Sequence, residues 1–169
     1  IIMSHLNANE NIASNSIIAN LSTNDANIED THTYSLVRGM GYIDNASFTI
    51  DGSDLKINSS PDFETKSSYS VRLKTTDSDG LSYEEAVTLS VIQKTYSLST
   101  SINVPQEEYA LTTTISTGNV AEGSTLYWSL SGTNITLSDF SDGALTGSGK
   151  VGSDGTFSFK HALANDGET

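Results

Sequence analysis

The sequence predicts an all-β fold of two consecutive antiparallel β-sandwiches, and three observations point to it. Apolar and polar residues alternate along many short segments, as in strands with one buried face, and helical spacing is nearly absent. Turn signals such as Asp51-Gly52 and Asp79-Gly80 separate the segments, because Asp and Gly tolerate the positive φ that tight turns require. Near residue 94 the composition changes, and Thr and Ser dominate the remainder. We therefore expect one sandwich in residues 1–94 and a second in residues 95–169.

Alternation identifies the strands of the first region. Tyr69, Val71 and Leu73 are apolar and the residues between them are polar, so one face of this segment is expected in the core. Short β-branched and aromatic strands that turns interrupt this often are typical of an antiparallel sandwich. The strands predicted in this way, in chain order, are residues 33–37, 48–50, 55–57, 69–74 and 86–91.

The second region repeats the alternation over a shorter length. Leu126, Trp128 and Leu130 point to one side of a predicted strand, and Phe157 and Phe159 do the same in the last hairpin. Trp128 is therefore expected in the core and not as a platform for a sugar. The region is short for a sandwich, which usually takes about 100 residues, so we expect its final strands to be missing.

The composition excludes several classes of protein. With 8 Lys and Arg against 21 Asp and Glu, the formal net charge is −13, which does not suit binding to nucleic acid. The chain has no cysteine, which excludes disulfides and thiolate metal sites. No apolar run approaches the roughly 18 residues that cross a bilayer, so this segment is not expected to span a membrane. The chain starts without Met, and we interpret it as a segment of a longer protein.

The sequence offers no catalytic motif. It contains no Gly-x-Ser-x-Gly elbow, no HExxH motif and no phosphate-binding glycine loop. Paired carboxylates could act as the acid and base of a glycosidase, but that chemistry needs a deep cleft, which a sandwich of about 95 residues rarely holds. We therefore expect no enzyme activity, and we expect His5, His32 and His161 to be solvated residues of strands or loops.

Acidic residues supply the only chemistry that the sequence suggests. They gather at strand ends and in loops, and Asp62 and Glu64 face the same side of an extended segment because they are two residues apart. Asp25 and Asn27 share that spacing. Carboxylates on one side repel each other unless a cation lies between them, and Ca²⁺ accepts 6–8 oxygen ligands from such groups. A solvated acidic surface that binds no metal stays open as the alternative.

A pattern of acidic and apolar residues extends over residues 62–77. It consists of Asp62, Glu64, Tyr69, Val71, Leu73, Thr75 and Asp77. This spacing resembles the cadherin signature, in which Asp-x-Glu precedes a Tyr-x-aliphatic-x-aliphatic strand and a Thr-x-Asp end. Upstream, Glu10-Asn11 resembles the acidic residue on the first strand of that family. The resemblance covers about residues 5–93 and is greatest to the cadherin-like repeats of large bacterial surface proteins.

The resemblance implies a seven-stranded, immunoglobulin-like Greek-key sandwich that binds Ca²⁺ at its ends. It implies one half-site, facing the next domain, formed by Glu10, Asp62 and Glu64. It implies another, facing the preceding domain, formed by Asp25, Asn27 and Asp77. Three features depart from the pattern: Asn27 carries no charge, Lys94 stands where the family has an acidic linker, and the glycine after Asp77 comes one residue late, at Gly80. The site that faces the next domain is therefore expected to be weak or empty.

The second region resembles part of a Calx-β repeat. Residues 112–117, 126–132 and 138–140 carry this resemblance, and residues 165–169 are similar to the acidic loop before the last strands of that family. Calx-β repeats are also calcium-binding sandwiches, so the resemblance implies further Ca²⁺ ligands. These candidates are Glu107, Glu108, Asp166 and Glu168.

The combined features predict a calcium-binding repeat segment of a large extracellular or cell-surface adhesion protein, in which Ca²⁺ stiffens the interdomain junctions. The partners implied are neighbouring repeats of the same chain, other surface proteins and glycans. The alternative is a carbohydrate-binding or spacer module of a secreted hydrolase, since the strands present Tyr and Thr and the second region is rich in glycine. A third hypothesis is a bare spacer whose acidic loops bind nothing.

Overall fold

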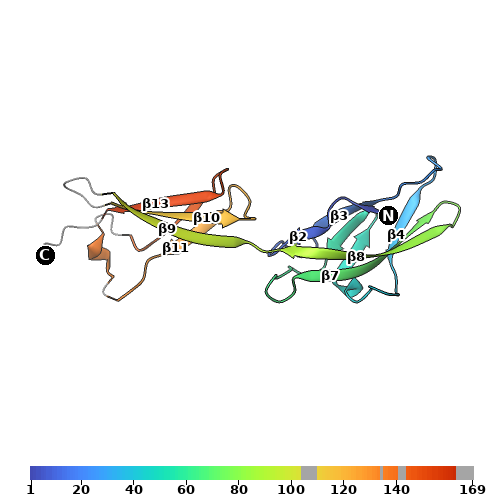
Figure 1. Cartoon of the computed structure of the whole chain (residues 1–169), viewed down its shortest axis with the longest axis horizontal. Coiled ribbons are helices and arrows are strands. Elements are labelled where there is room, and N and C mark those ends of the chain that lie inside the picture. Colours follow the sequence, from blue (N-terminus) through green and yellow to red (C-terminus); the bar gives the residue numbers. More distant parts are fainter. Residues whose placement is uncertain (104–109, 134, 141–143, 163–169) are drawn as a thin grey trace. The chain divides into compact units, whose positions relative to one another are not determined.

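The chain forms two compact units, Ile1–Gln93 and Lys94–Thr169, which we call unit 1 and unit 2. The computed structural model describes the chain except for residues 104–109, 134, 141–143 and 163–169 (Figure 1). Strands supply nearly all of its regular structure, so the predicted all-β class is confirmed. Over the described ranges, the structure contains no helix with the length and apolar character that a membrane span requires.

Unit 1 is a sandwich of two four-stranded sheets. The first sheet has the order β1 (Ile2–Met3), β3 (Ile17–Ser22), β6 (Asp54–Ile57) and β5 (Phe48–Asp51). The second has the order β2 (Asn7–Asn9), β8 (Ser82–Ile92), β7 (Ser68–Asp77) and β4 (His32–Leu36). The chain crosses between the sheets from β3 to β4 and from β6 to β7, which gives the predicted Greek-key arrangement. The first strand is divided between the sheets as β1 and β2.

Alternation along β7 determines which side chains fill the core of unit 1. Val71 and Leu73 are completely buried and Thr75 is 4% exposed, whereas the residues between them are only partly covered. From the facing sheet, Leu55 and Ile57 of β6 are at most 1% exposed. Because burial of one such aliphatic side chain contributes about 1.5–3 kcal/mol, these few residues supply much of the stability of unit 1. The predicted strand faces are confirmed here.

Asp44 connects the segment after β4 to β7. Its carboxylate forms an ion pair with Lys66 and accepts a 2.7 Å hydrogen bond from the backbone amide of Ser70. The side chain of Asp44 is 12% exposed. Burial by itself would raise the pKa of Asp44, but the bonds from Lys66 and Ser70 outweigh it, so the pKa of Asp44 lies below its usual value.

We expect Asp44→Asn to reduce the acid sensitivity of unit 1. Because the pKa of Asp44 is lower in the folded chain, its carboxylate stabilises unit 1 above the unfolded pKa of about 3.9. That contribution is lost as the pH falls through the lower, folded value. The variant should be less stable than the wild type at neutral pH and should lose less stability between about pH 5 and pH 2. Thermal unfolding followed by circular dichroism measures both effects, and parallel pH profiles would contradict the assignment.

Unit 2 contains two sheets in its described residues. β9 (Thr95–Asn103), β10 (Ala110–Gly118) and β13 (Thr156–Ala162) form an antiparallel sheet with the order β13-β10-β9. β11 (Thr125–Ser129) and β12 (Thr146–Lys150) pair as a second sheet. Two short 3₁₀ helices complete the described structure: η1 (Asn45–Ser47) in unit 1 and η2 (Leu137–Asp139) in unit 2. The described residues of unit 2 thus form one sheet of three strands and one of two.

Aromatic side chains form the core of unit 2. The half-buried Trp128 of β11 stacks on Phe159 of β13, with 4.3 Å between the ring centroids, so its predicted core role is confirmed. Tyr127, on the opposite face of β11, is 82% exposed, as the alternation predicts. A Cβ atom at Gly149 of β12 would overlap the ring of Phe157, so glycine at this position lets β12 approach the aromatic side of β13.

Two of the three histidines are not solvated, and the prediction for them is wrong. His161 is 1% exposed and lies against Trp128 and Phe140, at centroid distances of 4.8 and 5.1 Å. It follows Phe157 and Phe159 at the same two-residue spacing on β13, so its side chain points into the core. The side chain of His32 is 12% exposed and its Nε2 lies 3.1 Å from Asp25 Oδ2. His5 is exposed, as predicted.

Candidate metal centres

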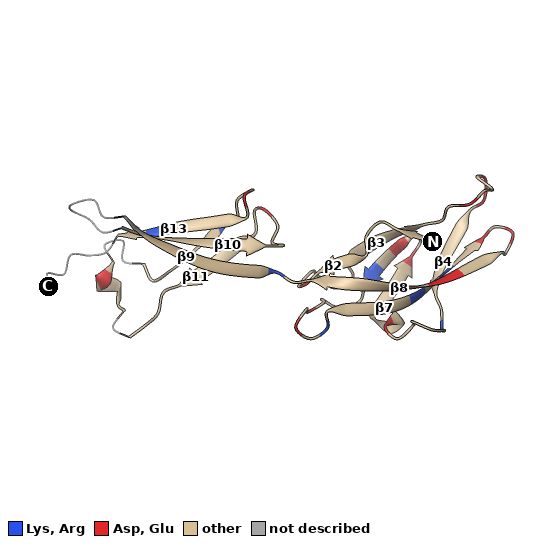
Figure 2. Cartoon of the chain, viewed as in Figure 1, with Lys and Arg blue, Asp and Glu red and all other residues tan. Residues whose placement is uncertain are grey.

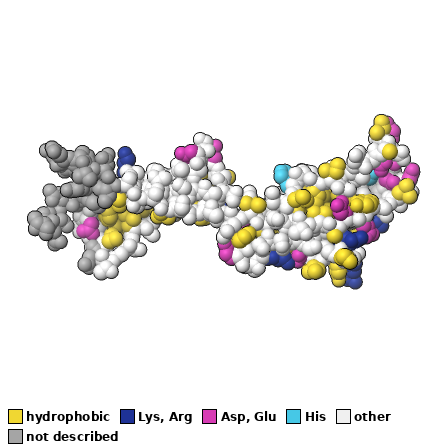
Figure 3. Space-filling view, viewed as in Figure 1, with side chains coloured by type: hydrophobic (Ala, Val, Ile, Leu, Met, Phe, Trp, Pro, Cys, Tyr) yellow, Lys and Arg dark blue, Asp and Glu magenta, His cyan; other side chains and the backbone are white. Residues whose placement is uncertain are grey.

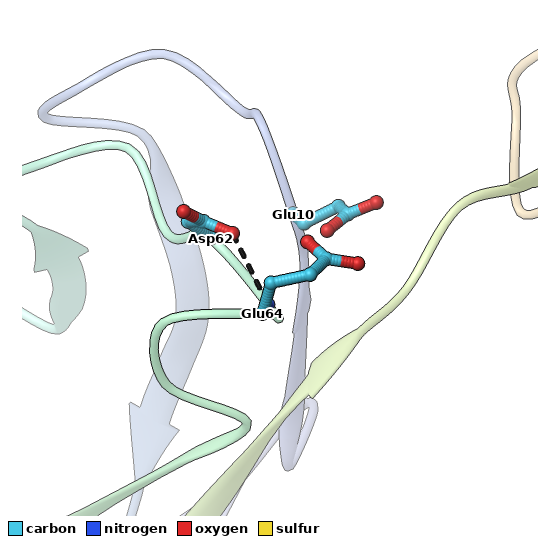
Figure 4. Close-up of side chains that lie close together, drawn as sticks. All are labelled: Glu10, Asp62 and Glu64. Atoms are coloured by element: carbon cyan, nitrogen blue, oxygen red, sulfur yellow. Dashed lines mark hydrogen bonds between the residues drawn. The ribbon is translucent and has the colours of Figure 1, made fainter.

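Glu10, Asp62 and Glu64 form the first of two carboxylate clusters, which we call cluster A. Glu10 follows β2, and Asp62 and Glu64 lie in the loop from β6 to β7. One carboxylate oxygen from each residue lies within 4.8 Å of the others (Figure 4). Oxygens that share one Ca²⁺ at about 2.4 Å lie within about 5 Å of each other, so the three residues have the spacing of a shared ion.

Hydrogen bonds fix the positions of two members of cluster A. Asp62 accepts bonds of 3.1 Å from the backbone amide of Glu64 and 2.7 Å from the hydroxyl of Thr65. The Thr65 hydroxyl, together with the groups of Glu64, lowers the pKa of Asp62 below its usual value. Glu10 is 5% exposed and accepts a 3.3 Å bond from the backbone amide of Phe63. Asp62 therefore stays ionised beside a buried carboxyl group, which is an arrangement that a cation stabilises.

Gln93, the last residue of unit 1, contacts cluster A. Its side-chain Nε2 donates a 2.7 Å hydrogen bond to Glu64 Oε1. The assignment of Nε2 and Oε1 in a Gln side chain can be exchanged by a rotation of the amide, and the exchanged form would present an oxygen to the cluster. The residue that precedes unit 2 therefore contacts cluster A through its amide nitrogen, and a rotation of that amide would present its oxygen to a bound ion.

Asp25, Asp30 and Asp77 form the second cluster, which we call cluster B. Asp25 and Asp30 lie in the loop from β3 to β4, and Asp77 is the last residue of β7. One carboxylate oxygen from each lies within 4.8 Å of the others. Figure 2 shows the acidic residues of this loop and of the neighbouring β7–β8 turn in red. The two clusters therefore use different loops of unit 1.

Local hydrogen bonds shape cluster B. Asp25 accepts a 2.9 Å bond from the backbone amide of Asn27, which together with His32 lowers the pKa of Asp25. Asp77 Oδ1 accepts bonds from the backbone amides of Asp79 at 3.0 Å and Leu81 at 2.8 Å, which hold the β7–β8 turn against the cluster. An open depression of about 570 Å³ adjoins Asp25 and Asp77. Ca²⁺ and its coordinating waters have room to enter cluster B from solvent.

The structure brings together all five carboxylates that the sequence singled out as ligands in unit 1. Glu10, Asp62 and Glu64 meet in cluster A, and Asp25 and Asp77 meet in cluster B. Asn27 lies in the same loop with an exposed side chain, and its backbone amide supports Asp25. The candidates Glu107, Glu108, Asp166 and Glu168 lie outside the residues that the structure describes.

Asp30 is the member that sequence reasoning missed. It lies five residues after Asp25, so no two-residue spacing relates them. The backbone amide of Asp30 donates a 3.1 Å bond to the carbonyl of Asn27, which turns the loop back, and Ser78 donates a 2.8 Å bond to Asp30 Oδ1. Only this turn and the approach of the β7–β8 turn bring Asp30 to the cluster.

Comparison with known proteins gives no sequence match. No family model matches the chain, and no curated protein matches it. Similar solved structures include the protocadherin gamma B7 extracellular cadherin domains 1–4, with 16% identity, a TM-score of 0.41, and coverage of 68% of this chain and 44% of that chain.

Two other solved structures have comparable sequence identity and TM-score. Protocadherin gamma B2 extracellular cadherin domains 1–5 have 14% identity and a TM-score of 0.43, over 78% of this chain and 28% of that chain. Zebrafish RET cadherin-like domains 1 to 4 have 12% identity and a TM-score of 0.42, over 95% of this chain and 39% of that chain. The chain thus spans less than half the length of each of these three structures. The β-sandwich architecture rests on the strand order and the buried core of the chain itself.

Proposed function

We propose that this chain is a calcium-binding repeat segment of an extracellular or cell-surface adhesion protein, and that it is not an enzyme. The observation that carries the proposal is the pair of clusters A and B, each with three carboxylate oxygens within 4.8 Å of one another. Three negative charges at this spacing destabilise the folded unit unless a cation neutralises them. Two such clusters in one small domain favour a metal-dependent role.

Ca²⁺ is the metal that fits these ligands best. Both clusters offer carboxylates, and backbone carbonyls and the amide oxygens of Asn27 and Gln93 lie in the same segments. Hard oxygen ligands in irregular loops suit Ca²⁺, which tolerates 6–8 ligands and flexible geometry, whereas Mg²⁺ demands near-ideal octahedral sites. Extracellular modules of this kind bind Ca²⁺ at about 10⁻⁴–10⁻³ M, so the sites would be filled outside cells.

Cluster A is the candidate for stiffening the junction with the following unit. Its Glu64 contacts Gln93, and Lys94 begins unit 2 immediately afterwards. An ion bound by Glu10, Asp62 and Glu64, with Gln93 as a further oxygen ligand, would restrict the motion of the chain where unit 1 ends. The same mechanism would apply to cluster B if another repeat precedes this segment in the full protein.

We expect saturable Ca²⁺ binding in isothermal titration calorimetry, with two classes of site. Asp62→Asn with Glu64→Gln should remove the binding of cluster A, and Asp25→Asn with Asp77→Asn should remove that of cluster B. Because a ligand at ten times its dissociation constant adds about 1.4 kcal/mol to the stability of the bound form, Ca²⁺ should also raise the melting temperature of the wild type.

A control variant separates specific binding from the general effect of charge. Asp51→Asn with Asp54→Asn removes two carboxylates from the paired ends of β5 and β6, outside both clusters. This variant should bind Ca²⁺ like the wild type. No binding heat from the wild type in millimolar Ca²⁺, or an equal loss of heat in the control, would reject the calcium proposal. Glycan binding that persists in EDTA would instead favour the carbohydrate-binding alternative.

A further inference from the structure

The buried face of β7 becomes polar where it reaches cluster B. Leu73 is completely buried, and it is followed on the same face by Thr75, which is 4% exposed, and then by Asp77 of the cluster. On β4, Tyr34 lies directly opposite Thr75, and His32 lies directly opposite Asp77. Residues that face each other in a ladder have neighbouring side chains. A polar layer therefore separates the apolar core of unit 1 from the carboxylates.

Three hydroxyl groups, of Thr23, Tyr34 and Thr75, form the inner part of this layer, and we call them the hydroxyl layer. The Thr23 hydroxyl is hydrogen-bonded to the hydroxyl of Tyr34 at 3.1 Å and to that of Thr75 at 2.9 Å. Thr23 follows β3 immediately and precedes Asp25 by two residues. Its two bonds thus connect the start of the β3–β4 loop to β4 and to β7. In Figure 3 acidic side chains gather at the end of unit 1 that carries this loop.

His32 forms the outer part of the layer. Its Nε2 lies 3.1 Å from Asp25 Oδ2, and the backbone amide of Asn27 donates a bond to Asp25 Oδ1. Asp25 is ionised at neutral pH because its pKa is lowered, and a carboxylate only accepts hydrogen bonds, so Nε2 carries the hydrogen of this contact. The side chain of His32 is 12% exposed, so its ring is packed in place. Both oxygens of Asp25 are therefore held by the chain itself.

We propose that the hydroxyl layer and His32 are positioning residues, which hold Asp25 against Asp77 and thereby set the Ca²⁺ affinity of cluster B. This role rests on the proposed function, since it requires that the cluster binds Ca²⁺. Asp25 belongs to a loop and Asp77 to a central strand, so the two ligands share no local constraint. A loop that must be ordered during binding weakens the binding, and contacts that order it beforehand raise the affinity.

Thr23→Val tests the hydroxyl layer, because valine keeps the shape of threonine and removes both hydrogen bonds. The variant is made in the background of Asp62→Asn with Glu64→Gln, so that calorimetry detects Ca²⁺ binding at cluster B alone. Its dissociation constant for Ca²⁺ should rise about tenfold, as is common when a group that supports a metal ligand is lost. Thr23→Ser keeps the hydroxyl and should bind Ca²⁺ like the parent protein.

Tyr34→Phe is a milder variant, which removes one hydroxyl and keeps the ring against the core. It should weaken Ca²⁺ binding at cluster B by roughly threefold, as the loss of one hydrogen bond predicts. Tyr69→Phe is the matched control, because Tyr69 is a partly buried tyrosine of β7 outside the hydroxyl layer, and its Ca²⁺ affinity should not change. A lower melting temperature in EDTA with an unchanged affinity at cluster B would indicate a purely structural role and overturn the proposal.

Amide hydrogen exchange in EDTA tests the positioning without Ca²⁺. The backbone amide of Asn27, which donates to Asp25, should exchange several times faster in Thr23→Val than in the wild type or in Thr23→Ser. Equal exchange in all three proteins would overturn the positioning role. A wild type that gives no heat with Ca²⁺ would reject the proposed function, and faster exchange in Thr23→Val would then still show that the hydroxyl layer orders the loop.

Discussion

Replacement of Leu55 by Ala should lower the free energy of unfolding of unit 1 by about 3 kcal/mol. Leu55 is completely buried and belongs to the cluster that joins the two sheets through Val71 and Leu73. Removal of a large side chain from such a site costs the transfer free energy of the lost atoms and leaves a cavity that rigid strands on both sides cannot fill. Since a typical domain is stable by only about 5–15 kcal/mol, the loss is a large fraction of the total.

Hydrogen exchange of the β7 amides is the suitable measurement, because β7 is central in its sheet and its amides open with unit 1 as a whole. Leu81→Ala serves as the control, since Leu81 is 72% exposed. The control should change stability by less than about 0.5 kcal/mol. Equal effects of the two substitutions would mean that the core of unit 1 does not lie between β6 and β7.

Phe159→Ala should destabilise unit 2 by about 3 kcal/mol and should change the fluorescence of Trp128. The ring of Phe159 stacks on Trp128 at 4.3 Å and also contacts Phe157 and His161, at centroid distances of 5.8 and 5.4 Å. Its removal separates the two sheets of unit 2 at their main aromatic contact. Water should then reach the indole of Trp128 and shift its emission to longer wavelength.

Trp128 is the single tryptophan of the chain, so denaturant unfolding followed by tryptophan fluorescence reports on unit 2. Tyr127→Ala is the matched control, because Tyr127 is an aromatic residue next to Trp128 on β11 and its side chain is 82% exposed. The control should keep both the emission maximum and the midpoint of the wild type. An unchanged midpoint in Phe159→Ala would show that the two sheets are held together by other contacts.

Much of the fold could be predicted from residue periodicity. The alternation of Tyr69, Val71 and Leu73 predicts both the strand and its buried face, because the side chains of a strand alternate with a fixed period of two. The same rule predicts the inward side of Trp128 and of Phe159. It also applies to His161, which continues the two-residue spacing of Phe157 and Phe159, although its polarity led us to predict a solvated side chain. In the structure the register prevails, and the imidazole packs against aromatic rings.

The candidate site could be predicted only in part. Asp62 and Glu64 are near each other in any extended segment, so the sequence itself places them together. Glu10 is a candidate only through the resemblance to a family pattern, because it lies 52 positions before Asp62 and no local rule relates them. Asp30 had neither a spacing nor a pattern to indicate it, and it reaches cluster B through a turn that Asn27 and Ser78 stabilise.

The sequence by itself determined the all-β class, the direction of the side chains along each strand, and the excess of negative charge. Only the tertiary structure decided which carboxylates converge into clusters A and B. The physical reason is that local spacing fixes where a side chain points relative to its own strand. Whether carboxylates from separate loops meet depends instead on which distant segments pair and pack. That pairing is decided by the whole set of hydrogen bonds and buried surfaces that the chain can form together.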